Sequence, residues 1–256
     1  MSISLNKYKN DLFFMELALK QARRSLGNTG LNPSVGCVIT ENKNVVSSAH
    51  TGFKGRPHSE SIAIKSTIKK SKNLKMYITL EPCSHYGKTS PCVNKIIKKK
   101  ITKVFFSIND PDLRTFNKSK KILTKAGVKV HQGILKKEIR LFYKSYLNYK
   151  SNKLPFVSSK LAISKDFFLK NKKKKWITSR LTRLKSHHLR CSHDSILTTA
   201  KTVIDDNPIL NCRINGLEKF SPTRLILDKS LKIPLSSKII QTAKNYETII
   251  FYNTKK

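Results

Sequence analysis

Four side chains that can bind a metal or move a proton stand in the first half of the chain: His58, Glu60, Cys83 and Cys92. One imidazole nitrogen and two thiolates are ligands that hold tetrahedral zinc, and three protein ligands leave a fourth position for water. Bound zinc lowers the pKa of that water to about 7, which makes hydroxide available at neutral pH. Glu60 follows His58 closely, so its carboxylate would lie beside the water and could transfer its proton. The set predicts a catalytic zinc site.

The order of these residues adds to their chemistry. His-x-Glu, followed by Pro-Cys and by a second Cys, is the arrangement of the zinc deaminases. Taken singly, each residue has an ordinary structural role, because a cytosolic cysteine is usually a small buried side chain. A purely structural zinc site would leave Glu60 without a function. We therefore interpret His58, Cys83 and Cys92 as zinc ligands and Glu60 as the general acid and base.

The spacing of the two cysteines narrows the class of substrate. Deaminases of nucleic acids and of free nucleosides have two residues between these ligands. Here the longer loop Ser84 to Pro91 separates them, and it carries His85, Lys88 and Thr89. A cation and hydrogen-bond donors at the mouth of the site suit a small substrate that bears a phosphate.

Helix-like and strand-like segments alternate around these residues, which predicts an α/β fold with a sheet covered by helices. For the first domain, 1–150, the pattern predicts helices at 11–25, from 59, from 90, 118–126 and 136–149, and strands at 35–39, 45–49, 76–80, 104–108 and 128–131. For the second domain, 153–256, it predicts a helix at 179–192 and strands at 156–163, 195–199, 224–227 and 247–252. We expect Asp11 to cap the first helix, and Ser90 with Pro91 to begin the third.

The chain is strongly basic: 52 lysines and arginines stand against 15 acidic residues, for a net charge of +37. Of the basic residues 42 are lysines, and they are scattered along the chain. Specific nucleic-acid readers instead concentrate arginine forks and aromatic side chains. We interpret the charge as solvated surface and expect no specific nucleic-acid partner.

The five cysteines are odd in number and spread out, which favours a reducing, cytoplasmic environment over a disulfide framework. No apolar run approaches the roughly 20 residues of a membrane helix, so we expect no membrane association.

Two other functions stay open at this point. A zinc deaminase acting on tRNA or another nucleic acid would use the net charge, although the long loop argues against it. A zinc-stabilised RNA-binding module would need no Glu60. His187, His188, Cys191 and His193 suggest a second metal site, but we favour an ordinary surface helix there.

Three segments resemble the bifunctional riboflavin-biosynthesis deaminase/reductase family: 32–39, 58–60 and 79–92. The resemblance implies a cytidine-deaminase-like three-layer domain followed by a partial dihydrofolate-reductase-like domain. It implies zinc ligation by His58, Cys83 and Cys92 and proton transfer by Glu60. It also implies that Asn32 and Lys88 bind a phosphoribosylaminopyrimidine.

The second half resembles the reductase domain of the same family, which binds NADPH. The resemblance implies that the dinucleotide contacts Ala162, Trp176, Thr202 and Asp206. It further implies that the substrate contacts Arg190, Leu210 and Arg213. Two arginines suit a phosphosugar.

Four departures from the family pattern are visible. Ser59 stands where the family usually has alanine. Residues 117–119 stand where the family has a glycine-rich loop, and Phe167 stands where it has a glycine. Family members also continue for about another domain's worth of residues. We therefore expect an intact deaminase attached to an incomplete reductase, either as a homo-oligomer or associated with a separate reductase chain.

Overall fold

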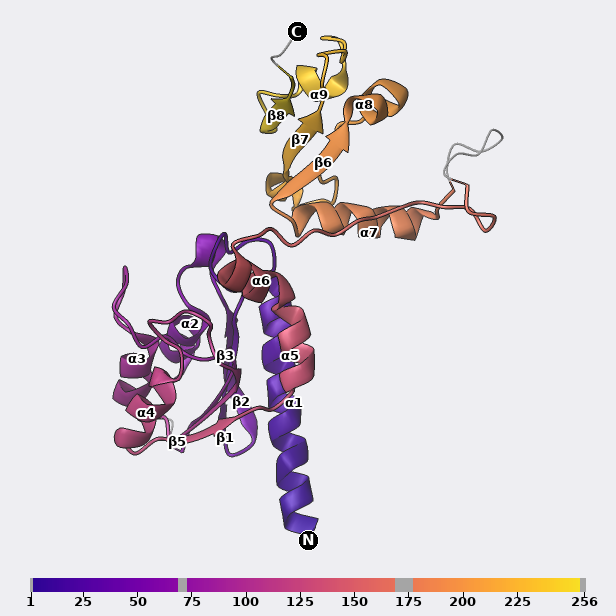
Figure 1. The fold of residues 1–256 in the computed structure, drawn as a ribbon. Coiled ribbons are helices and arrows are strands. Elements are labelled where there is room, and N and C mark those ends of the chain that lie inside the picture. The colour runs from indigo at the N-terminus through magenta and orange to yellow at the C-terminus, as the bar shows by residue number, and fades with distance from the viewer. Residues whose placement is uncertain (1, 69–72, 169–176, 254–256) are drawn as a thin grey trace. The chain divides into compact units, whose positions relative to one another are not determined.

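The chain forms two compact units, Met1–Val157 and Ser158–Lys256, in a computed structural model that describes residues 2–68, 73–168 and 177–253 (Figure 1). The sequence places the division slightly earlier, between 150 and 153. Each unit has its own sheet and its own buried core.

The first unit is built on a five-stranded mixed sheet with the strand order β2-β1-β3-β4-β5. The strands are β1 (Gly36–Glu41), β2 (Asn44–His50), β3 (Lys75–Leu80), β4 (Lys103–Ile108) and β5 (Lys129–Gln132). β1 pairs antiparallel with β2 and β3, whereas β3, β4 and β5 run parallel. The segments that follow β3 and β4 therefore lie at the same edge of the sheet, where ligands bind in open α/β sheets.

Helices cover both faces of this sheet. They are α1 (Ser2–Arg24), α2 (Ser59–Ser66), α3 (Cys92–Lys98), α4 (Lys118–Lys125), α5 (Lys136–Phe142) and α6 (Lys144–Asn152), and a short 3-10 turn spans Phe53–Gly55. α1 and α5 lie on one face, and α2, α3 and α4 lie on the other (Figure 1). The predicted three-layer α/β arrangement is thus confirmed.

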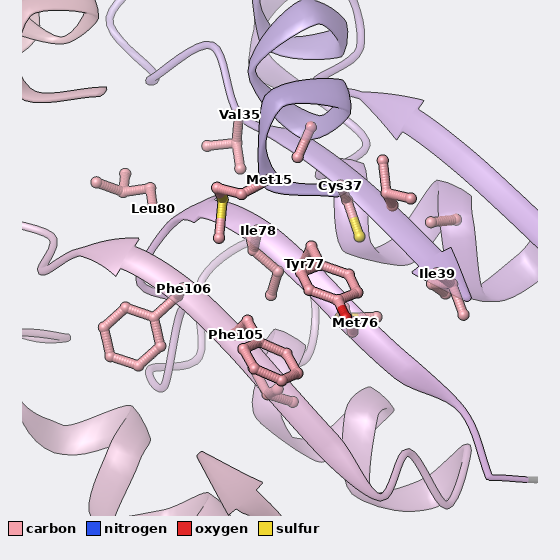
Figure 2. Packing of buried hydrophobic residues seen from close by; sticks show 14 of the residues in the cluster. Met15, Val35, Cys37, Ile39, Met76, Tyr77, Ile78, Leu80, Phe105 and Phe106 are labelled. Atoms are coloured by element: carbon pink, nitrogen blue, oxygen red, sulfur yellow. The ribbon is translucent and has the colours of Figure 1, made fainter. Parts of the chain in front are cut away.

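The central strands are apolar along almost their whole length because helices bury both of their faces. Figure 2 shows side chains of β1, β3 and β4 packed together with Met15 of α1. An aromatic ladder crosses the parallel strands: the ring of Phe105 stacks on Tyr77 at 4.7 Å and on His131 at 4.8 Å between centroids. Such cross-strand pairs hold the register of neighbouring strands.

The prediction that Asp11 caps the first helix is wrong. α1 begins at Ser2, so Asp11 lies in its interior, where it is buried and accepts a hydrogen bond of 2.6 Å from the Tyr77 hydroxyl. A good capping residue is also a good partner for a buried hydroxyl, and the tertiary contact decides between the two roles.

Two predicted helix boundaries also differ. α3 begins at Cys92 and not at Pro91, because Pro91 has an extended backbone with a ψ of 144° and so precedes the helix in place of Ser90. The helix expected at 136–149 is divided into α5 and α6 at Tyr143.

The second unit contains a three-stranded parallel sheet with the order β6-β7-β8. Its elements are α7 (Arg180–Cys191), β6 (Ser195–Thr199), α8 (Ala200–Asp206), β7 (Thr223–Leu227), α9 (Lys238–Gln241) and β8 (Thr248–Phe251), and a 3-10 turn spans Glu218–Phe220. The small core consists of Val203, Leu210, Ile226, Ile233 and Ile239.

A buried arginine lies at the centre of this unit. The Arg224 side chain is fully inaccessible to solvent, and its guanidinium donates hydrogen bonds of 2.6–3.0 Å. The acceptors are the carbonyl oxygens of Ile209, Ile239 and Tyr246 and the hydroxyls of Thr242 and Thr248. Burial lowers the pKa of Arg224 from its usual value. One charged group therefore joins α9, β8 and the segment after α8.

The strand expected at 156–163 is wrong, because this segment has no strand partner and is almost wholly exposed. Further along, Phe167 has a φ of 65°, a left-handed conformation that glycine adopts without steric cost. This is the position at which the family resemblance implies a glycine. No helix of the described residues is long and apolar enough to cross a membrane.

Candidate zinc site

Three neighbouring chain segments bring the metal-binding groups together. His58 is the residue that precedes α2, Cys83 follows the carboxyl end of β3, and Cys92 is the first residue of α3. The Cys92 amide donates to Cys83 Sγ over 3.2 Å, which fixes one thiol against the start of α3. Backbone amides at helix N-termini favour a negatively charged sulfur.

The three ligand atoms have the spacing that zinc requires. His58 Nδ1 lies 3.5 Å from Cys83 Sγ and 3.4 Å from Cys92 Sγ. All three ligand atoms lie within 4.8 Å of one another, and among the described residues this is the only such group of three or more. In a tetrahedral site with Zn–S of about 2.3 Å and Zn–N of about 2.0 Å, the S···N edge is about 3.5 Å. The donor set and its geometry therefore fit zinc.

Electrostatics within the group favour metal binding by one thiol in particular. The pKa of Cys83 is lowered to about 4, chiefly by the hydrogen bond from the Cys92 thiol and, against the effect of burial, by those from His58 and the Cys92 amide. The pKa of Cys92 is raised in turn, by its hydrogen bond to Cys83 and by burial. The pair therefore loses its first proton more readily at Cys83, and the thiolate is the form that coordinates metals.

Glu60 lies in the first turn of α2, two residues after His58. Its side chain is buried, and burial raises its pKa above the usual value for a glutamate. The Ser59 hydroxyl donates to Glu60 Oε2 over 3.0 Å. A buried carboxyl group with a raised pKa can hold a proton between two transfers, which is what general acid–base catalysis near neutral pH requires.

Two protein-family models match the chain, one for each unit. The cytidine and deoxycytidylate deaminase zinc-binding region matches residues 8–108, and the RibD C-terminal domain matches residues 155–256. The solved structure of a diaminohydroxyphosphoribosylaminopyrimidine deaminase/5-amino-6-(5-phosphoribosylamino)uracil reductase from Thermotoga maritima is 30% identical, with a TM-score of 0.88. The match covers 98% of this chain and 72% of that one. The chain belongs to the RibD family.

Other RibD proteins agree. A RibD structure from Acinetobacter baumannii is 30% identical, with a TM-score of 0.83 over 97% of this chain. The riboflavin biosynthesis protein RibD of Bacillus amyloliquefaciens is 38% identical over 231 residues, which are 89% of this chain and 62% of that protein. The match to the RibD protein of Actinobacillus pleuropneumoniae covers 65% of that protein. The chain therefore spans less than two thirds of the length of these curated relatives. The predicted zinc site and the predicted order of a deaminase-like and a RibD reductase-like domain are confirmed.

Asn32, which the RibD resemblance implies as a substrate contact, is held against the segment that leads to His58. Its side chain packs on Gly55, where a Cβ would lie only 2.2 Å from Asn32 Nδ2. Gly55 has a φ of +84°, so any other residue there would be strained as well as crowded. The placement of the Asn32 amide therefore depends on a glycine three residues before a zinc ligand.

Lys88 is exposed in the loop between the two cysteine ligands. A second cation, which the sequence analysis did not select, reaches the same loop: Arg56 donates to Thr89 Oγ1 over 3.2 Å. The sequence does place Arg56 two residues before the zinc ligand His58, which could have indicated that it lies near the site. Arg56 thus adds a second positive charge to the loop that carries Lys88.

The segment 117–119, at which the resemblance implies a glycine-rich loop, is fixed by Glu81. The buried Glu81 carboxylate accepts hydrogen bonds from the amides of Asn117 (3.2 Å) and Ser119 (3.1 Å). Asn117 has a φ of 58°, and asparagine tolerates this conformation better than most residues. Asn117 thus adopts, without being a glycine, the left-handed conformation that glycine usually occupies. The role of Glu81 was missed because nothing in the sequence links it to a loop so far along the chain.

The residues expected to contact substrate in the second unit lie around Asn211. Arg190 donates to the Asn211 carbonyl oxygen over 3.2 Å, and Arg213 donates to Asn211 Oδ1 over 3.5 Å. His187 Nδ1 lies 3.3 Å from the Arg190 guanidinium and accepts from the Arg213 amide over 3.2 Å. Leu210, next to Asn211, is buried and has a φ of 60°. Two arginines are thus held side by side.

The residues expected to contact NADPH lie on different segments of the second unit. Thr202 and Asp206 lie one turn apart on α8, and Ala162 lies in the irregular segment before α7. Trp176 lies outside the described residues. The alternative second metal site has no support in the described part of the chain, where the only metal-binding group contains none of its four residues, His187, His188, Cys191 and His193.

Proposed function

We propose that the first unit catalyses the hydrolytic deamination of diaminohydroxyphosphoribosylaminopyrimidine to 5-amino-6-(5-phosphoribosylamino)uracil in riboflavin biosynthesis, in the cytoplasm. The observation that carries the proposal is the buried Glu60 beside three zinc ligands that leave a coordination position open. The Thermotoga maritima relative, which is named for this deamination, supports the choice of substrate.

In this reaction one water is consumed and one ammonia is released. When bound, zinc supplies a Lewis acid that makes a water molecule acidic at neutral pH. Glu60 takes the proton of the attacking water and delivers it to the leaving amino group. The water oxygen bonds to the ring carbon as the carbon–nitrogen bond breaks. Asn32 hydrogen-bonds the pyrimidine, and Lys88 with Arg56 binds the ribose phosphate.

For the second unit we propose that Arg190 and Arg213 bind the phosphate of the same class of molecule. The support is that both guanidinium groups donate to Asn211 and that both residues contact His187. Reduction of the ribose by NADPH, held by Ala162, Trp176, Thr202 and Asp206, is the activity that the RibD C-terminal domain suggests. We further propose that this unit works in a homo-oligomer or with a separate reductase chain.

One assay tests both parts. Purified protein with its zinc content measured is given the pyrimidine phosphate, and ammonia release is followed with and without NADPH. Ammonia release with a zinc content near one per chain is the expected result. NADPH oxidation that depends on the deaminated product supports the second activity.

The rival functions give different results in the same assay. A tRNA deaminase would release ammonia from tRNA and not from the pyrimidine phosphate. A zinc-stabilised RNA-binding module would bind RNA and release ammonia from neither substrate. Either outcome overturns the proposed deaminase.

A further inference from the structure

The segment that carries Asn32 has no regular secondary structure; Asn32 is exposed, whereas Ser34 and Val35, which lead into β1, are buried. A buried backbone group without a partner is costly, so each must be satisfied by something other than a strand or helix. Here side-chain hydroxyls do this. Thr29 donates to the Asn32 carbonyl over 2.7 Å, and Thr51 donates to the Pro33 carbonyl over 3.2 Å and accepts from the Val35 amide over 2.8 Å.

Two further hydroxyls close a ring at the end of this segment. The Gly36 amide donates to Thr79 Oγ1 over 3.1 Å, the Thr79 and Tyr143 hydroxyls lie 2.6 Å apart, and Tyr143 donates to the Ser34 carbonyl over 2.9 Å. An amide can only donate and a carbonyl can only accept. Thr79 must therefore donate to Tyr143, and the direction of every hydrogen bond in the ring is fixed.

Tyr143 comes from a distant part of the chain, 109 residues after Ser34. It stands at the break between α5 and α6 and is 2% exposed. The match to the deaminase zinc-binding region ends at residue 108, so this tyrosine lies outside it. From this break its hydroxyl reaches Ser34 and Thr79.

We propose that Tyr143 and Thr79 are positioning residues of the deaminase, which hold the backbone of Ser34 to Gly36 so that Asn32 is presented to the substrate. This inference rests on the proposed function, since it takes Asn32 as a substrate contact. The ring acts on binding and not on the proton transfers of Glu60. The helices after residue 108 are thus a working part of the deaminase site.

The test is the Tyr143→Phe variant, which keeps the ring and removes the hydroxyl. We expect its KM for the pyrimidine phosphate to rise about tenfold, with kcat and zinc content within about twofold of the wild type. Tyr77→Phe is the matched control, because it also removes one buried hydroxyl, here bonded to Asp11 in the same unit. Its KM is expected to change less than twofold. An equal rise in both variants would mean a general loss of stability and would overturn the proposal.

A double-mutant cycle identifies the route of the effect. If Tyr143 acts through Asn32, then Tyr143→Phe changes KM little when Asn32→Ala is already present. Independent, multiplying effects contradict the proposal.

Hydrogen exchange separates a failure of this inference from a failure of the proposed function. If the wild-type protein releases no ammonia from the pyrimidine phosphate, the proposed function fails. The ring is then judged by the Gly36 amide, whose exchange should be at least about tenfold faster in Tyr143→Phe than in Tyr77→Phe. Equal exchange rates of the Gly36 amide in the two variants would show that the Tyr143 hydroxyl does not hold this backbone, and would overturn the inference.

Discussion

The two units differ in how the faces of their sheets are covered. In the first, helices cover both faces, and one apolar cluster extends from α1 through all five strands to α5. In the second, one face packs against α8 and α9, where Ile226 is fully buried. The side chains of the opposite face stay in contact with solvent.

Register shows that the exposed side chains form one surface. Leu197 pairs with Leu225 and Ile249, and Thr199 pairs with Leu227 and Phe251. Leu197, Leu227, Ile249 and Phe251 are between 41% and 61% exposed. Parallel sheets are almost always covered on both faces. The helices of the first unit thus bury both faces of its sheet. The second unit is stabilised instead by the buried Arg224 and by an apolar core on one face of its sheet.

The largest effect is expected at the site of the complete unit. Glu60→Gln should lower deaminase kcat about a thousandfold, since removing a general acid and base costs two to four orders of magnitude. Zinc content should stay near that of the wild type, because the three ligands are untouched. Binding of inorganic phosphate to the second unit should not change. Turnover within tenfold of the wild type would contradict the assigned role.

A large loss of stability is expected from Arg224→Met. Five buried or half-buried acceptors lose their donor, which should cost the second unit about 3 kcal/mol or more. Hydrogen exchange read by mass spectrometry measures this for each unit separately. Peptides of the first unit should be unaffected. Arg213→Met, at an exposed arginine, is the control and should change stability by less than about 0.5 kcal/mol.

The two faces of the second sheet can be compared directly. Ile226→Ala should lower the free energy of unfolding of this unit by about 2 to 3 kcal/mol, because it leaves a cavity. Leu197→Ala, on the uncovered face of β6, should change it by less than about 0.5 kcal/mol. Urea titration followed by hydrogen exchange provides both values. Equal losses would show that the Leu197 face is covered in solution.

The first unit should lose stability at high pH because of its buried tyrosines. Burial, with the hydrogen bond to Asp11, raises the pKa of Tyr77 far above the unfolded value of about 10. The stabilisation is therefore complete below pH 10 and is lost as the pH rises further, by up to about 1.4 kcal/mol per pH unit. Tyr77→Phe should have a shallower decline, measured by thermal unfolding between pH 9 and 11. Parallel curves for the two proteins would contradict this assignment.

The smallest effect concerns backbone strain in the second unit. Phe167 has a φ of 65°, which costs a residue with a side chain about 1 kcal/mol. Phe167→Gly should stabilise this unit by about 0.5 kcal/mol, after allowance for the greater freedom of glycine in the unfolded chain. The readout is the midpoint of urea unfolding, and Phe168→Gly serves as the control that should not stabilise.

The sequence predicted the parts of the molecule that local patterns determine. The strands of the first unit follow from buried apolar runs, and the zinc ligands follow from residue type and order. Asp11 and the segment 156–163 were misread because both fit a local pattern that a tertiary contact, or the lack of a pairing strand, overrides. The contact of Tyr143 with Ser34 could not be predicted, since no periodicity connects residues 109 positions apart.

The edge strands of the two sheets differ in a way that affects folding yield. β5 begins with Lys129 and is short, and charge of this kind discourages one edge from pairing with another. β8 has the sequence Thr-Ile-Ile-Phe, without a charged residue. The other edge of that sheet, β6, has the sequence Ser-Ile-Leu-Thr-Thr and is uncharged as well. At high concentration during refolding, molecules should add to one another at these two edges, and a lysine placed in either strand would act as a gatekeeper against aggregation.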